Sequence, residues 1–249
     1  MSELVDCINS LSAKDIIKSI AKTANGTPFY LQTSGLTGGP DSIAGLEFWF
    51  DGQDATTFAL NGNKVTQWDD KSGNARHVGN AVDAERPTWS AVTGRVTFVA
   101  ASSTTLTSGL FVVFDQPITV FVLYKLTGAL NVSMVAFGGI GAATNVFAHA
   151  SLFKIRSATM LAAGATNAND NIHVAEFNGV TSNYWINGVL GAGPGDAGAV
   201  GMGQIIFGAT TTAAWYADME VMEAFGYSRV LSVDERTDLS SYLTNKWGL

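Results

Sequence analysis

Three carboxylates near the C-terminus have residue types and spacing that could do acid–base chemistry. Asp218, Glu220 and Glu223 form the pattern D-x-E-x-x-E in a segment that alternates at period two. Retaining glycoside hydrolysis needs two carboxylates about 5–5.5 Å apart over one cleft. Asp218 and Glu220 share one face of a strand, whereas Glu223 falls on the other face unless a bulge intervenes. We therefore expect no enzyme, but a solvated strand on which Glu223 bonds to nearby backbone or to Arg229.

Acidic turns in the first third of the chain offer oxygen ligands for a metal ion. The candidate ligands are Asp51, Asp54, Asp69, Asp70 and Asn74. Calcium takes six to eight oxygen ligands, which several turns together could supply. The same residue types also build tight turns, and this is the stronger interpretation. Calcium is therefore kept as an alternative, and no other cofactor is expected.

The remaining motifs point away from chemistry. Residues 193–198 satisfy G-x-G-x-x-G, but they contain Pro194 and open no helix, so dinucleotide binding is not predicted. The three histidines are far apart and lack the H-E-x-x-H spacing of a zinc site. We expect most of the six tryptophans in the core. Trp89 and Trp215 lie beside turns and are the candidates for stacking on a sugar.

Short alternating segments separated by turn residues predict an all-β body. Residues 118–124 are almost wholly apolar and predict a strand buried on both faces. Asn187-Gly188 predicts a two-residue hairpin turn of type I′. The period then changes near the C-terminus, where Ser232 and Glu235 form a capping box. A set of apolar and aromatic residues follows at helical spacing and predicts a helix packed on the body: Leu239, Tyr242, Leu243 and Trp247.

The N-terminal residues predict a separate attachment segment. Residues 1–24 show the pattern of two short helices with one apolar stripe, made of Leu4, Val5, Ile8, Leu11, Ile16, Ile17 and Ile20. Helices this short are marginal in water, so the stripe should dock on a partner, on a second copy, or on an open edge of the same body. The Gly-rich residues 35–45 end this segment. We therefore predict an anchoring segment at 1–45 and one domain at 46–249.

Composition narrows the classes of partner. The net charge of −7 and the pI near 4.8 argue against nucleic-acid and anionic-membrane surfaces. Charged residues make up 14%, against about 25% in ordinary domains, which indicates a surface covered by partners. Cys7 is the single cysteine, so no intrachain disulfide is expected. The acidic N-terminus does not predict a secretory signal, and the period-two segments do not predict membrane spans.

Several stretches together resemble laminin-G-like, concanavalin A-like jelly-roll domains. The resemblance covers roughly residues 45–249, and it implies a two-sheet antiparallel sandwich with Glu223 at the family's acidic position. It rests on LEFWFDGQD at 46–54, VTQWDDKSGNARH at 65–77, RPT at 86–88 with the hairpin segments 96–98 and 105–106, HVAEFNGVTSNYWINGVL at 173–190, and the strand, YSRVLS and KWGL of 215–249. The fold serves glycan binding, hydrolysis and assembly alike.

The expected function combines this fold with the composition. A sandwich of extracellular type without a signal peptide or a disulfide is typical of proteins that leave the cell within a particle. We expect a non-enzymatic structural protein of a tailed-phage virion, made in the host cytoplasm. A capsid decoration or head-fibre role is favoured, with other virion proteins and further copies as partners. The alternative is a lectin-like module that recognises host-surface glycans. A hydrolase is the third and least favoured hypothesis.

Overall fold

The computed structural model describes residues 38–128, 152–209 and 215–249 fully, and the backbone of strands at 20–22, 28–30, 132–137 and 144–149. The contacts divide the chain into two compact units, Met1–Thr37 and Gly38–Leu249. The second unit includes the 3-10 turn Pro40–Ser42, whose Pro40 carbonyl accepts a hydrogen bond from the Tyr227 hydroxyl at 2.9 Å. Residues 38–45, interpreted from the sequence as linker, therefore belong to the compact unit.

The N-terminal unit contains a short antiparallel pair, β1 (Ile20–Lys22) and β2 (Pro28–Tyr30). The helix predicted to reach Ala24 is therefore wrong at Ile20, which lies on β1. Asn25-Gly26, interpreted from the sequence as a helix stop, lies outside the described residues. The other six residues of the predicted stripe lie outside the described residues.

One sheet of the sandwich is built on two nine-residue strands, β10 (Ile118–Leu126) and β19 (Met219–Tyr227), paired antiparallel. β15, β16 and β17 follow on the β10 side, while β3 and β8 both pair with β19. We call this the helix-covered sheet. The added strands are β15 (Asn171–Phe177), β16 (Ser182–Ile186), β17 (Val189–Gly195), β3 (Leu46–Asp51) and β8 (Arg95–Phe98).

The second sheet, called the open sheet, has the strand order β14-β13-β12-β11-β18-β9, all antiparallel. Short strands then connect β9 back to β8 through β6, β5 and β7, with β4 paired to β5. The bounds are β14 (Thr159–Ala165), β13 (Leu152–Ser157), β12 (Thr144–His149), β11 (Val132–Phe137), β18 (Ile206–Phe207), β9 (Leu106–Ser108), β6 (Val78–Gly79), β5 (Lys64–Trp68), β7 (Thr88–Ser90) and β4 (Phe58–Asn61).

Local sequence explains several of these elements. Residues 118–124, predicted as a strand buried on both faces, are fully buried in β10. Between β16 and β17 the backbone has φ of 51° at Asn187 and 78° at Gly188, as a type I′ turn requires. The predicted all-β sandwich is confirmed. Its core, between the two sheets, includes Phe50, Trp68 and Phe207.

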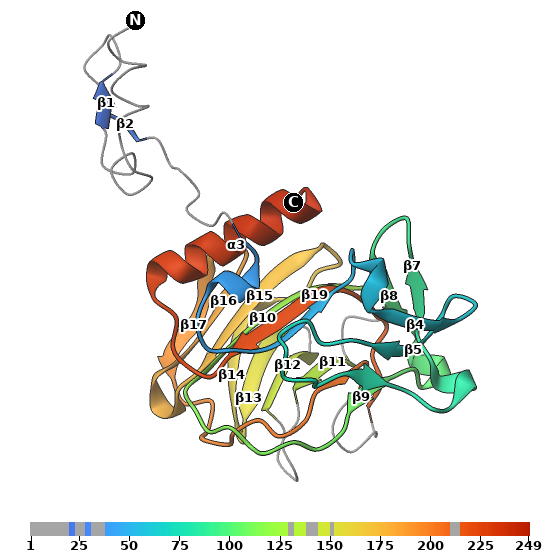
Figure 1. The fold of residues 1–249 in the computed structure, drawn as a ribbon. Coiled ribbons are helices and arrows are strands. Elements are labelled where there is room, and N and C mark those ends of the chain that lie inside the picture. Colours follow the sequence, from blue (N-terminus) through green and yellow to red (C-terminus); the bar gives the residue numbers. More distant parts are fainter. Residues whose placement is uncertain are drawn as a thin grey trace, which may run out of the picture. The chain divides into compact units, whose positions relative to one another are not determined.

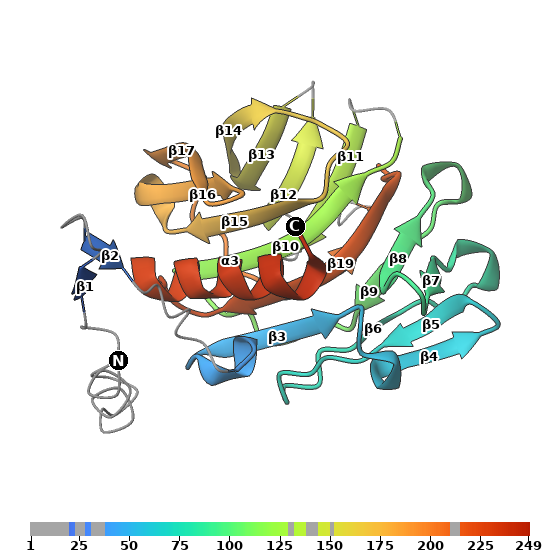
Figure 2. The ribbon, with the colours of Figure 1, turned by 90° about the horizontal axis from the view of Figure 1, so that it is seen from above.

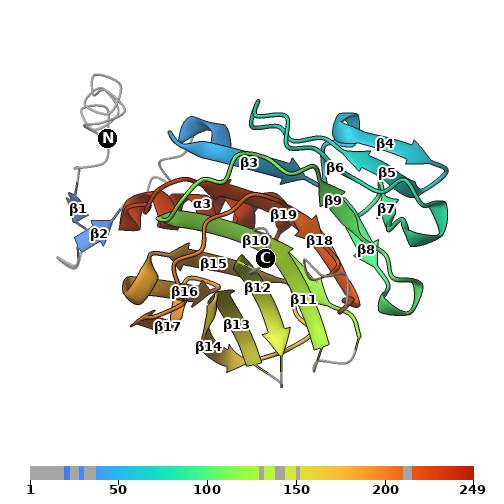
Figure 3. The same cartoon turned by 90° about the horizontal axis from the view of Figure 1, so that it is seen from below.

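The C-terminal helix α3 (Val233–Trp247) lies on the outer face of the helix-covered sheet (Figures 1 and 2). Its predicted capping box is present, and Leu239 and Leu243 are fully buried. Phe121 and Phe225 stack at 4.9 Å on the sheet face that the helix covers. Among the described residues, Figure 3 shows no helix on the outer face of the open sheet. Within the described ranges, no helix has the length and apolar character needed to cross a bilayer.

Candidate functional site

A β-bulge decides how the acidic strand β19 presents its carboxylates. Leu123 lies opposite Glu223 while Tyr124 lies opposite Val221, so Met222 is the extra residue. Val221 and Ala224 both face the core, and Glu223 therefore points to the outer face together with Glu220. The sequence alone did not decide whether a bulge occurs in this strand, and the structure shows that it does. The bulge brings Glu223 under α3.

Glu223 is fully buried and joins the helix to the sheet. One carboxylate oxygen accepts hydrogen bonds from Trp49 Nε1 and from the Tyr242 hydroxyl, both at 2.9 Å. The other accepts from Trp247 Nε1 and from Lys246 Nζ, both at 2.8 Å. Burial raises the pKa of Glu223, and the Lys246 ammonium opposes that shift.

The predicted environment of Glu223 is therefore wrong. The carboxylate is not on a solvated strand face, because α3 covers it. Arg229 does not bond to it, because its guanidinium pairs with Glu235 at 2.6 Å, at the start of the helix. The same hydrogen bond from Arg229 lowers the pKa of Glu235 to about 2.

Two of the proposed calcium ligands are paired with lysines instead. Lys71 Nζ lies 2.9 Å from Asp51 and 2.8 Å from Asp54. Lys246 Nζ lies 2.6 Å from the other oxygen of Asp51, which links this pair to Glu223. The hydrogen bond from Lys71 lowers the pKa of Asp54 to about 2. The Lys71 ammonium thus forms ion pairs with both carboxylates.

The other three calcium candidates organise the turn at 69–77. Asp70 accepts hydrogen bonds from the Trp49, Ser72 and Arg76 backbone amides and from the Ser72 hydroxyl, at 2.9–3.0 Å. Asn74 Nδ2 donates to backbone carbonyls, the Glu47 carbonyl being 2.9 Å away. Asp69 is half-exposed and lies 3.2 Å from His77. Across the described ranges no group of three or more His, Cys, Asp or Glu could hold a metal ion.

The remaining two carboxylates of the acidic pattern are held apart from Glu223. Glu220 pairs with Arg95 at 2.9 Å, and Arg95 also binds Asp170 in a bidentate pair. Asp218 accepts a hydrogen bond from the Ala100 backbone amide at 2.9 Å. Each carboxylate therefore has its own structural partner, and none of the three shares a partner with another.

The two histidines whose side chains are described, His77 and His173, both form structural contacts. The backbone amide of Asp70 donates to His77 Nδ1 at 3.1 Å. His173 is fully buried between the sheets, where its Nδ1 lies 2.7 Å from the Tyr184 hydroxyl and its ring stacks on Tyr124 at 4.3 Å. Burial lowers the pKa of His173 to about 3, so the ring is neutral at physiological pH. The His149 side chain lies outside the described residues.

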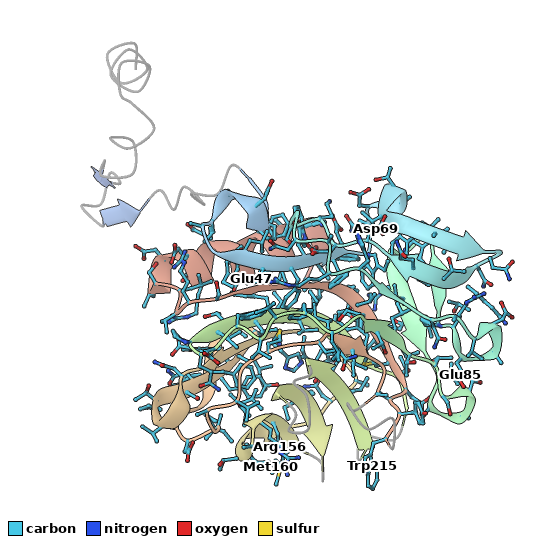
Figure 4. The ribbon with its side chains drawn as sticks, turned by 60° about the horizontal axis from the view of Figure 1, so that its bottom comes forward. Glu47, Asp69, Glu85, Arg156, Met160 and Trp215 are labelled. Carbon is cyan, nitrogen blue, oxygen red and sulfur yellow. The ribbon has the colours of Figure 1, made fainter. Side chains whose placement is uncertain are left out.

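The two tryptophans proposed to stack on sugars have different environments. Trp89 donates its Nε1 hydrogen to the Gly52 carbonyl at 2.9 Å and stacks on Phe58 at 4.6 Å. It therefore closes one end of the core. Trp215 has 53% of its surface exposed and points away from the body (Figure 4). Of the two, Trp215 has the exposure that a sugar-stacking residue needs.

Figure 4 shows Trp215 on the side of the molecule where the outer face of the open sheet lies, and we call that outer face the open face. The neighbouring Tyr216 packs there on Ile206, the outward-facing residue of β18. Arg156 and Met160 project from the same side (Figure 4). They are cross-strand partners on β13 and β14, and Met160 is 56% exposed. The open face thus carries apolar, aromatic and cationic side chains.

The sequence reasoning missed Arg156 and Met160. The sequence does contain a feature that could have pointed to this region, since residues 116–169 contain no Asp or Glu. In a chain with a net charge of −7, such a stretch marks a region of different charge. Recognising it as one face required the strand register, which places Arg156 opposite Met160.

No family model matches the sequence, and no curated protein matches it. Solved structures do resemble the fold. A Trypanosoma rangeli sialidase in complex with sialic acid matches at a TM-score of 0.56 and 12% identity, covering 98% of this chain and 39% of the sialidase. The binding domain of Paraclostridial Mosquitocidal Protein 1 matches at 0.53 and 10% identity, covering 81% and 52%. This chain thus spans about two-fifths to one-half of these proteins. What it shares with them is a jelly-roll-like β-sandwich fold.

Proposed function

We propose that this protein is a non-enzymatic carbohydrate-binding module that contacts glycans with its open face. The observation that carries the proposal is Trp215, a tryptophan 53% exposed on the side of the open sheet. An indole presents a flat apolar surface and one hydrogen-bond donor, which suits the mixed apolar and polar surface of a sugar ring. An exposed indole is also free to lose its contact with water when a sugar stacks on it, which is favourable.

The state of the carboxylates supports binding rather than hydrolysis. Hydrolysis by the common two-carboxylate mechanism requires one carboxyl group free to donate a proton and a second placed about 5–10 Å away, depending on the stereochemistry. Glu223 is enclosed by two indoles, a phenol and an ammonium group, and Glu220 is held by Arg95. A substrate could reach Glu223 only if α3 left the sheet. Both carboxylates of β19 therefore form structural contacts that hold the fold together.

The structural neighbours support the same class of function. The sialidase was solved with sialic acid, and the clostridial protein is described as a binding domain. At 10–12% identity the residues are not comparable, so the support comes from the shared sandwich. The glycan surface itself is argued from this chain's own exposed side chains.

A substitution at Trp215 tests this proposal. In a glycan array followed by calorimetry on the strongest ligand, we expect Trp215→Ala to weaken binding roughly fivefold, since an aromatic contact contributes about 1 kcal/mol. Trp215→Phe keeps an aromatic surface and should retain most of the affinity. Because Trp215 is exposed, neither change should lower the melting temperature. Wild-type protein that binds no glycan, or Trp215→Ala with full affinity, would count against the proposal.

A second candidate function is assembly into a particle. Two observations favour it: the contacts assign residues Met1–Thr37 to a compact unit of their own, and charged residues make up only 14% of the chain. In this proposal the protein is a structural component of a tailed-phage virion, made in the host cytoplasm. The N-terminal unit attaches it to other virion proteins, and the sandwich is displayed outward. The two candidates are compatible, because a displayed sandwich can also bind a glycan.

The N-terminal unit can be tested by deletion. We expect a chain that starts at Gly38, the first residue of the second unit, to fold, because it keeps the core and the Pro40 contact, but to lose self-association and attachment to particles that lack the protein. Sedimentation velocity and co-pelleting with such particles are the measurements. If the shortened chain still oligomerises and attaches, the N-terminal unit is not the anchor.

A further inference from the structure

The charge of the open sheet differs from that of the whole chain. Its strands β9, β11, β12, β13, β14 and β18 contain no Asp or Glu, and their only Lys or Arg residues are Lys154 and Arg156. Both cations lie on β13. The chain as a whole has a formal charge of −7. The sheet is therefore locally positive on an acidic protein.

Both cations point outward. Burial alternates along β13, with Phe153, Ile155 and Ser157 buried and the residues between them half-exposed. Phe153 and Ile155 belong to the core between the sheets. Since alternate residues of a strand face opposite sides, Lys154 and Arg156 lie on the open face. Arg156 is seen there beside Met160 in Figure 4.

Arg156 also differs from the other arginines of the described chain. Arg76, Arg86, Arg95, Arg229 and Arg236 each have a carboxylate within 4 Å. Among the described residues Arg156 has no such partner, and its Nε donates a long hydrogen bond to the Ala158 carbonyl at 3.4 Å. Within the described part of the chain, its two terminal nitrogens have no partner and can bind a ligand. A guanidinium group binds a carboxylate or sulfate through two parallel hydrogen bonds.

We propose that the open face selects anionic glycans, with Arg156 binding a carboxylate or sulfate of the sugar while Trp215 contacts the sugar chain. Lys154 adds positive charge on the same face. The inference rests on the proposed carbohydrate-binding function and narrows its ligand class. Charge complementarity is its basis, because the acid-free sheet attracts an anion that the rest of the acidic surface repels.

Matched ligands separate this inference from the proposed function. The full-length protein is titrated calorimetrically with lactose and 3′-sialyllactose, which differ by one carboxylate-bearing sugar, and with heparin and dextran oligosaccharides as a sulfated and neutral pair. We expect the anionic member of at least one pair to bind about tenfold more tightly, the size expected for hydrogen bonds to a charged group. Raising the salt concentration should reduce that preference.

Three variants assign the effect to Arg156. Arg156→Ala should lose about tenfold in affinity for the anionic ligand and leave any neutral-glycan affinity unchanged. Arg156→Lys keeps the charge but not the paired donors, so an intermediate affinity is expected. Lys64→Ala removes one positive charge from β5, outside the open face, and serves as the control with full affinity. Melting curves confirm that each variant is folded.

The outcomes are distinguishable. Equal affinity for charged and neutral glycans, or an Arg156→Ala variant as tight as wild type, would overturn the anionic preference and leave glycan binding standing. Absence of binding to every glycan would overturn both proposals. A single-stranded oligonucleotide that binds as tightly as the anionic glycan would show a general polyanion surface and would also overturn the inference.

Discussion

Glu223→Ala is expected to lower the free energy of unfolding by about 3–5 kcal/mol, the cost of removing one partner from a buried ion pair. The carboxylate accepts hydrogen bonds from Trp49, Tyr242, Trp247 and Lys246, and it is fully buried. Its removal leaves both indole N–H groups and the phenol without an acceptor. Lys246 retains Asp51, so part of the network survives. Chemical denaturation, with tryptophan fluorescence as the signal, measures the loss.

The matched control for this prediction is Glu220→Ala on the same strand. Glu220 is partly exposed, and its partner Arg95 keeps a bidentate pair with Asp170. We expect a loss of about 1 kcal/mol or less. If Glu223→Ala cost no more than Glu220→Ala, the assigned role of Glu223 in holding α3 to the sheet would be wrong.

A chain that ends after Val230 is expected to lose cooperative folding. The deletion removes Leu231, Leu239 and Leu243, all fully buried, and uncovers the Phe121 and Phe225 rings. Burying three such leucines contributes roughly 5–9 kcal/mol at 1.5–3 kcal/mol each. That is comparable with the entire stability of a typical domain. Differential scanning calorimetry should therefore show no cooperative transition, or the protein should be insoluble.

A shorter deletion controls for the position of the chain end. A chain that ends at Trp247 keeps α3 and its contacts with Glu223, and loses only the exposed Gly248 and Leu249. It should melt within roughly 4 °C of the full chain, the shift produced by about 1 kcal/mol. A chain ending after Val230 that melted cooperatively at the same temperature would show that α3 contributes no stability.

Elements governed by local chemistry could be predicted from the sequence. The type I′ turn at Asn187-Gly188 needs two residues that tolerate positive φ, and the capping box at Ser232 and Glu235 needs only residues three apart. β10 could be recognised because nearly every residue is apolar. In these cases neighbours in the sequence determine the structure.

The candidate site depended on long-range register, which the sequence could not supply. The direction of Glu223 was decided by the bulge at Met222, and its partners came from β3 and α3, up to 174 positions away. Trp89 and Trp215 both lie beside turns, yet one is packed on Phe58 and the other is exposed. The sequence around Ile20 is compatible with a helix and with a strand. In the structure Ile20 pairs with Tyr30 and therefore lies on a strand.

The central claim, that this sandwich binds glycans without cleaving them, is tested most directly by one incubation. Full-length protein is incubated with an array of glycans, and retention on each glycan and release of new reducing ends are measured together. We predict retention on a subset of glycans and no new reducing ends on any. Reducing ends released by wild type and abolished by Glu223→Gln or Glu220→Gln would contradict the account in favour of a hydrolase.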